Sequence, residues 1–182
     1  MKVNMSYKHV LGMDDKAVAV DAAFVDAIHA LNESNCRYMV IGGAALLLHN
    51  LERTPRDYDI WLDPDSENVA TIKKTFESLG EDFLGFAADD LIRQNFASPI
   101  IESIFTFSPH NIDFRIRADG ASFSSCYRGK SSTIWGCHVI SLFDLLVMKL
   151  EAKRPIDIQD IKLIQGKLIT QRGSNHAEAK GE

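Results

Sequence analysis

Apolar residues along the first half of the chain alternate between helical and strand spacing. The first helical period follows an expected cap at Asp14 or Asp15, and its apolar face consists of Val20, Phe24, Ile28 and Leu31. The elements predicted after it are a buried strand at 38–41, a short buried helix at 44–48, a strand at 56–62, and a helix that starts at 64–66 and stops at Gly80. Strands that alternate with helices in this way are typical of mixed α/β domains.

The second half of the chain predicts hairpins followed by helices. Strand-like runs at 101–107 and 112–117 flank a short polar loop, which is typical of a β-hairpin. Residues 133–140 predict another strand or a small hairpin that turns at Gly136. Ser141 and Asp144 resemble a capping box for a helix over 142–152, and a last helix is expected over 157–169. Residues 82–99 show no clear period, although a short helix near 90–95 fits them.

These elements predict an α/β (α+β) fold in which helices flank a mixed β-sheet. The chain has 182 residues, 46% of them hydrophobic, which suits one globular domain that buries a core. We therefore expect a single domain over residues 1–170, with a helical C-terminal part at 141–170. Residues 171–182 contain no large apolar side chain and are expected to form a disordered tail.

The charge balance excludes one broad class of protein. The chain has 20 Lys and Arg residues against 25 Asp and Glu residues, for a net charge of -5, whereas a protein that coats DNA is clearly basic. The acidic excess lies in residues 1–110, and residues 111–182 are net positive. A basic group in that second half is either a solvated face or a contact for triphosphate or RNA; its members are Arg115, Arg117, Arg128 and Lys130.

The cysteines and the N-terminus indicate where the protein resides. Cys36, Cys126 and Cys137 have no metal-ligand spacing, so we expect three reduced thiols in the cytoplasm. The N-terminus lacks the apolar stretch of a secretory signal, and no apolar run is long enough to span a bilayer. A membrane partner is therefore not expected.

Two carboxylates in the predicted strand at 56–62 carry the first sign of chemistry. Asp57 and Asp59 are two residues apart, so the alternation of a strand puts both on one face, opposite Ile60 and Leu62. Two like charges on one face repel each other, and a divalent cation would relieve that repulsion. Mg²⁺ prefers such carboxylate oxygens together with phosphate oxygens and water. The alternative is a solvated strand face.

Gly42 and Gly43 lie between a buried strand and a helix start, just before that acidic strand. Glycines at such a position let a phosphate approach the backbone and the N–H groups of the helix N-terminus. The alternative is a tight turn from strand to helix without a ligand. The sequence thus places an expected phosphate site and an expected metal site on consecutive strands.

Asp113 is the third candidate carboxylate, on the polar face of the strand at 112–117. Three carboxylates on adjacent strands form a cradle for two metal ions in phosphoryl or nucleotidyl transfer. Asp113 would complete the second metal site, activate the attacking hydroxyl, or do both. Glu102 and Asp119 are the alternatives for this position.

These residues resemble the signature of the nucleotidyltransferase superfamily, whose members include DNA polymerase β-like enzymes. Gly42-Gly43, the Asp57-x-Asp59 strand and the later Asp113 match that signature in order. Gly43 replaces the serine that is usual after the first glycine. Arg53-Thr54 before Asp57 is similar to the R-x-T-x-D approach of prokaryotic members, although one residue tighter, so Arg53 receives no assigned role.

A second block is similar to AbiEii-type abortive-infection toxins and related minimal nucleotidyltransferase-like proteins. It consists of Lys149, Arg154, Asp157 and Asp160. The resemblance implies that Lys149, Asp157 and Asp160 bind the nucleotide. Read without it, Lys149 is a helix lysine that extends to solvent, and the two aspartates favour a helix N-terminus electrostatically.

The expected function is transfer of a nucleoside monophosphate from an NTP to an acceptor hydroxyl, with Mg²⁺ or Mn²⁺. The acceptor would be an RNA or tRNA end, a protein or a small molecule. The toxin resemblance implies a role in a toxin–antitoxin system, with an antitoxin-like partner. Two alternatives remain: a non-catalytic module that binds a nucleotide or a partner protein, and a metal-dependent phosphohydrolase.

Overall fold

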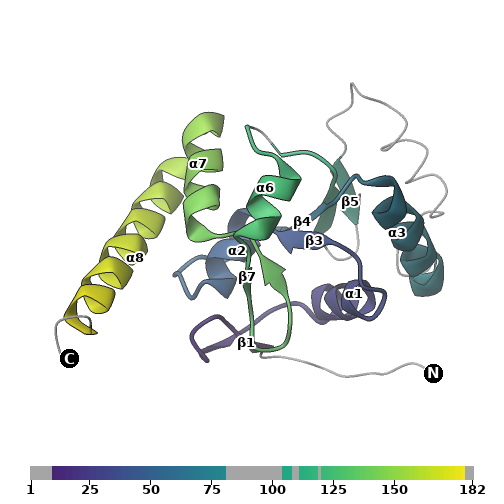
Figure 1. Ribbon diagram of the computed structural model, residues 1–182, viewed down its shortest axis with the longest axis horizontal. Helices are drawn as coiled ribbons and strands as arrows, with labels where there is room; N and C mark the ends of the chain where they lie inside the picture. The colour runs from purple at the N-terminus through teal and green to yellow at the C-terminus, as the bar shows by residue number, and fades with distance from the viewer. Residues whose placement is uncertain (1–9, 81–103, 108–110, 119, 179–182) are drawn as a thin grey trace.

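The computed structural model describes residues 10–80, 104–107, 111–118 and 120–178, and most of them are arranged around one mixed β-sheet (Figure 1). The described sheet has six strands in the order β5-β6-β4-β3-β8-β7. Its strands are β3 (Tyr38–Val40), β4 (Tyr58–Leu62), β5 (Ile104–Phe107), β6 (Ile112–Arg115), β7 (Ser131–Ser132) and β8 (His138–Val139). The predicted fold class, a mixed sheet flanked by helices, is confirmed.

Strand directions within the sheet decide which side chains become neighbours. β4 runs parallel to β6 and antiparallel to β3, while β3 runs parallel to β8. β5 and β6 form an antiparallel hairpin that confirms the prediction for this region, and β7 and β8 form a second one. Gly136, with a φ of 83°, lies in the connection of that second hairpin, as predicted.

Two helices cover one face of the sheet. They are α1 (Ala22–Glu33) and α3 (Ser66–Leu79). Phe24 of α1 stacks on Tyr58 of β4 with ring centroids 4.5 Å apart, and Phe76 of α3 meets Phe114 of β6 edge-on at 4.8 Å. The apolar sides of β4 and β6 therefore face these helices, as the strand alternation predicts.

The opposite face of the sheet carries shorter helices. They are α2 (Gly42–Leu48) and α6 (Phe123–Arg128). Trp61 of β4 is buried and meets Phe123 of α6 edge-on, with centroids 5.3 Å apart. Asp59 lies on the same face as Trp61, two residues earlier on the strand. This face is thus apolar at one end of β4 and acidic at the other.

The C-terminal helices α7 (Leu142–Ala152) and α8 (Asp157–Glu178) lie side by side at one end of the molecule, and α1 and α3 lie at the other (Figure 1). The predicted capping box at the start of α7 is confirmed, because Ser141 Oγ accepts a hydrogen bond from the Asp144 N–H at 3.0 Å. The expected helix end at Ile169 is wrong. α8 continues to Glu178, so residues 171–178 are helical rather than a disordered tail.

The N-terminal region also differs from the prediction. Asp21, not Asp14 or Asp15, caps α1, and its side chain accepts a hydrogen bond from the Ala23 N–H. Asp15 has a φ of 58° in the turn of a small hairpin formed by β1 (Val10–Leu11) and β2 (Ala17–Val18). The apolar period was correct, but a polar turn of this hairpin resembles a helix cap in sequence. The helix expected at 90–95 lies outside the described residues.

All three cysteines are buried and form no disulfide. Burial raises the pKa of each thiol, and it does so most for Cys137, so the folded protein disfavours their thiolate forms.

Candidate functional site

Two of the three predicted carboxylates lie directly beside each other. β4 and β6 are parallel, and their register pairs Asp59 with Asp113. Partners in such a ladder point to the same face of the sheet, so both side chains share one environment. Asp59 is 8% exposed and Asp113 is 6% exposed. The structure thus brings together two buried acidic groups from segments that are far apart in the sequence.

Arg115 is the cation of this carboxylate pair. Its Nε donates to Asp59 Oδ1 at 2.6 Å, and its Nη2 lies 3.8 Å from Asp113 Oδ2. Arg115 is two residues after Asp113 on β6, so the strand alternation puts both on the same face. The sequence indicated that shared face, but Arg115 was grouped with the basic residues of the second half instead of with the carboxylates.

One oxygen of this pair has no hydrogen-bond partner within the part of the chain that the structure describes. Asp113 Oδ1 is buried and accepts no hydrogen bond from any described residue. An unsatisfied buried polar group costs about 1–3 kcal/mol, and more when it is charged. A cation or donor supplied by a ligand would remove that cost.

Gly42, at the start of α2, borders the carboxylate pair on one side. It has a φ of 64°, and a Cβ built on it would overlap Asp59 Oδ2. The Ile41 N–H donates to the backbone carbonyl of Asp59 at 2.9 Å, which fixes the start of α2 against β4. At Gly43, by contrast, an added Cβ would meet only Pro55, at an ordinary 3.5 Å. The structure therefore requires the first glycine and leaves space for a side chain at the second.

The electrostatics of Asp59 reflect the crowding of negative charge. Burial raises the pKa of Asp59, and the carboxylates of Asp57 and Asp113 raise it further, which together outweigh the opposing effect of Arg115. The ionised form of Asp59 is therefore less favourable in the folded protein than in the unfolded chain. The folded protein therefore loses stability as pH rises from the ordinary carboxyl pKa through the raised pKa of Asp59. A bound cation would reverse that loss.

Asp57 is not part of the register that pairs Asp59 with Asp113. It is half-buried and precedes β4, which begins at Tyr58 and not at residue 56 as expected. Within the described part of the chain, no three His, Cys, Asp or Glu side chains are arranged so that they could hold a metal ion. The set of Asp57, Asp59 and Asp113 as metal ligands accordingly stays a prediction. The alternatives Glu102 and Asp119 lie outside the described residues.

The second predicted block forms a buried ion network between α7 and α8. Lys149 is only 4% exposed, so it does not extend to solvent. Its Nζ donates to Asp157 Oδ1 at 3.0 Å and to Asp160 Oδ2 at 2.7 Å. Arg154 donates to both oxygens of Asp157, at 2.7 and 3.1 Å. Both aspartates are therefore already engaged by cations of the same chain.

Arg53 connects this network to the acidic strand. Its Nε lies 2.9 Å from Asp160 Oδ1, and it stands in the segment that leads to Asp57. The two sequence blocks therefore meet through an ion pair that no local pattern in the sequence indicates. Spacing alone could not have shown it, because more than a hundred residues separate Arg53 from Asp160.

Burial of Asp157 opposes its ionisation, but hydrogen bonds from Arg154 and Lys149 outweigh that effect. Together with the charges of these two cations, they lower the pKa of Asp157. The carboxylate thus stays ionised well into the acidic range, and the network contributes its stability at neutral pH.

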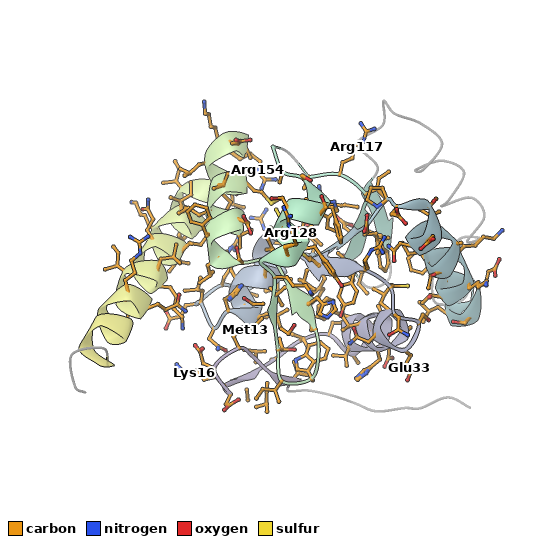
Figure 2. All side chains as sticks on the ribbon, viewed as in Figure 1. Met13, Lys16, Glu33, Arg117, Arg128 and Arg154 are labelled. Atoms are coloured by element: carbon orange, nitrogen blue, oxygen red, sulfur yellow. The ribbon has the colours of Figure 1, made fainter. Side chains whose placement is uncertain are left out.

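Two members of the basic group of the second half contact side chains of the protein itself. Arg115 is engaged by Asp59, and Lys130 Nζ lies 3.9 Å above the ring of Tyr127. Figure 2 shows Arg117 beyond the end of β6 and Arg128 on α6; both are exposed. Contact of this group with triphosphate or RNA stays a prediction.

A pocket of about 300 Å³ lies away from the carboxylate pair. It is lined by parts of α7 and α8 together with His49, whose Nε2 lies 2.8 Å from the Ile140 carbonyl oxygen. None of the predicted site residues lines it. Burial lowers the pKa of His49, so this histidine stays neutral at physiological pH.

Comparison with known proteins adds no assignment to this geometry. No protein-family model matches the chain, and no curated protein matches it. None of the described helices is long and apolar enough to cross a membrane.

Proposed function

We propose that this protein is a metal-dependent nucleotidyltransferase. The observation that carries the proposal is the juxtaposition of Asp59 and Asp113 on parallel strands, directly against Gly42. A carboxylate pair beside a backbone position that has no room for a side chain suits a metal-bound phosphate, which needs both hard oxygen ligands and close approach to the chain. The order of these residues in the sequence supports the same class of enzyme.

The described side chains do not form a ready set of three metal ligands, but two features of the carboxylate pair suit a Mg²⁺ or Mn²⁺ ion. Asp113 Oδ1 has no hydrogen-bond partner among the described residues, and the carboxylates of Asp57 and Asp113 raise the pKa of Asp59. Asp57, Asp59 and Asp113 would hold the ion, which would neutralise charge that develops on the transferred phosphate. Asp113 Oδ1 would also take the proton of the acceptor hydroxyl.

The C-terminal network supports this site from a distance. Lys149, Asp157 and Asp160 bind one another, and Arg53 links them to the segment that carries Asp57. We propose that these residues hold that segment in position. Their direct contact with the nucleotide, which the family resemblance implies, is a separate prediction.

The acceptor and the setting follow from the same resemblance. An acceptor hydroxyl on RNA, tRNA, a protein or a small molecule would approach near the exposed Arg117 and Arg128. The three buried thiols suit a reducing cytoplasm. An antitoxin-like partner would control the activity if the protein acts as a toxin.

One observation favours a second candidate, a module of the same fold that binds a nucleotide or a protein without transferring anything. The ion pair of Arg115 with Asp59 gives that carboxylate a structural partner, so it does not require a metal. Nucleotide binding that persists without transfer would identify this alternative.

The experiment that tests the proposal is incubation with each α-labelled NTP, Mg²⁺, and either total tRNA or cell lysate. We expect label transfer by the wild type and its loss when Asp57→Asn and Asp59→Asn are combined. Asp15→Asn, a change to an exposed aspartate in the β1–β2 turn, is the charge control and should transfer label normally. A wild-type protein that neither transfers label nor binds NTP in the presence of Mg²⁺ would rule out the enzyme.

A further inference from the structure

We infer that Arg115 takes the place of one of two metal ions, so that the site holds a single divalent cation and Arg115 stays on Asp59 when that cation is bound. The inference rests on the proposed function and deepens it. It replaces the expected two-metal cradle by one metal ion and one guanidinium.

The contacts of Arg115 leave a defined set of oxygens for a metal ion. Its guanidinium faces Asp59 Oδ1 at 2.6 Å and Asp113 Oδ2 at 3.8 Å. The other oxygen of each carboxylate is not engaged by Arg115, and Asp113 Oδ1 has no hydrogen-bond partner among the described residues. One side of the carboxylate pair is thus occupied by a cation already, and the other side has an orphaned, buried acceptor.

The charge of the site fits one divalent ion. Without nucleotide, the carboxylates of Asp59 and Asp113 less the guanidinium of Arg115 leave a charge of -1. Asp57, whose charge also acts on Asp59, brings it to -2, which a single Mg²⁺ or Mn²⁺ balances. A second ion would leave an excess positive charge next to side chains of low exposure, where water screens charge poorly. Without Arg115, the three carboxylates carry a charge of -3, so one divalent ion leaves a charge of -1 that attracts a second ion.

Asp59 is held in a way that keeps Arg115 in place. Its Oδ2 lies against the backbone of Gly42, and its Oδ1 accepts the short hydrogen bond from Arg115. The side chains of Asp59 and Asp113 are 11% and 8% exposed, and that of Arg115 is 26% exposed. A charge-assisted hydrogen bond with so little competing water is strong.

The first test counts bound Mn²⁺ by the electron paramagnetic resonance signal of the free ion, without nucleotide. Ions are counted at the site only when a protein binds them and the same protein with Asp59→Asn added does not. We expect one ion in the wild type, one in Arg115→Lys and two in Arg115→Met. Arg128→Met, which removes an exposed arginine of α6, is the control for charge loss and should bind one.

Two ions in the wild type, or one in a folded Arg115→Met variant, would overturn the inference while the proposed function stands. A wild type that binds no Mn²⁺ at all would overturn the metal site and the inference together. These outcomes separate the failure of the inference from the failure of the proposed function.

The second test measures the wild-type protein and needs a variant, Arg115→Lys, only for assignment, so it does not depend on whether Arg115→Met folds. The ¹⁵Nε resonance of Arg115 is followed by nuclear magnetic resonance during titration with Mg²⁺ and is assigned by its absence in Arg115→Lys. We expect the resonance to keep its hydrogen-bonded position at saturating Mg²⁺. A shift to the position of a solvent-exposed arginine would mean that the metal displaces Arg115, and would overturn the inference.

Discussion

Gly42 illustrates how one residue can fix both the backbone and the chemistry of a site. Its positive φ starts α2 directly after β3, and its missing side chain leaves room for the Asp59 carboxylate. Gly43 has neither constraint, which explains why another residue could occupy this second position. The two adjacent glycines therefore tolerate substitution to different degrees, although they form one motif in the sequence.

This difference gives a stability prediction. Gly42→Ala should lower the free energy of unfolding by about 2–4 kcal/mol, because it adds left-handed strain and an overlap with Asp59 Oδ2. Gly43→Ala should raise that free energy by up to about 1 kcal/mol, because alanine favours a helix. Urea unfolding of both variants measures the contrast. Equal effects of the two substitutions would contradict the structure.

Individual site residues were predicted from the sequence to very different degrees. Strand alternation put Asp57 and Asp59 on one face of their strand and Asp113 on the polar face of its own, because a period of two fixes the face of each side chain. The pairing of Asp59 with Asp113, and the contact of Arg115 with Asp59, did not follow, since both depend on the register between β4 and β6. The cations that hold Asp157 and Asp160 come from α7, the turn after it and a distant segment, and no local pattern encodes such contacts.

At the scale of elements, the pairing of α7 with α8 depends on buried charge as well as on apolar contact. Asp157, at the start of α8, is 1% exposed and accepts hydrogen bonds from Lys149 of α7 and from Arg154. A buried charge that loses its partner is strongly destabilising, so each member of this network matters to the whole helix pair.

The lowered pKa of Asp157 predicts how this pairing responds to pH. Its contribution is fully present above the ordinary carboxyl pKa of about 4, and it is lost as pH falls through the lower pKa of the folded state. Asp157→Asn should therefore cost about 3 kcal/mol at pH 7 and progressively less below pH 4.

Urea unfolding of the wild type and of Asp157→Asn between pH 7 and pH 3 measures this difference. Asp15→Asn is the matched control, because Asp15 is exposed in a turn that also accepts asparagine, and its effect should stay within about 0.5 kcal/mol. A stability loss in Asp157→Asn that is constant over the whole range would contradict the role assigned to the carboxylate charge.

At the scale of the whole molecule, the sequence predicted the central elements better than the ends. Strands and helices with a clear period were found, because burial against the sheet imposes that period. The end of α8 was missed for the opposite reason: a helix continues by adding one backbone hydrogen bond for each residue, even where no apolar side chain needs burial.

The last part of α8 should accordingly contribute little to stability. Ile164 is fully buried, and Lys167 forms an ion pair with Asp14, whereas Ile169 is 71% exposed. A chain that ends after residue 170 should keep its free energy of unfolding within about 0.5 kcal/mol.

A chain that ends after residue 163 is the comparison. It loses Ile164 and should be destabilised by about 3 kcal/mol or more. Urea unfolding compares both truncated chains with the full chain. A large loss on removal of residues 171–182 alone would show that this segment has contacts beyond those described here.

The register between β4 and β6 also limits how the length of this protein can vary. Successive side chains of a strand point to opposite faces, so deletion of one residue within β6 before Asp113 would turn this carboxylate toward α3 and bring Phe114 to the acidic face. A change of two residues would restore the face but shift Asp113 away from Asp59. Variants of this chain that keep the site can therefore change the length of connecting loops, but the number of residues within these two strands is fixed.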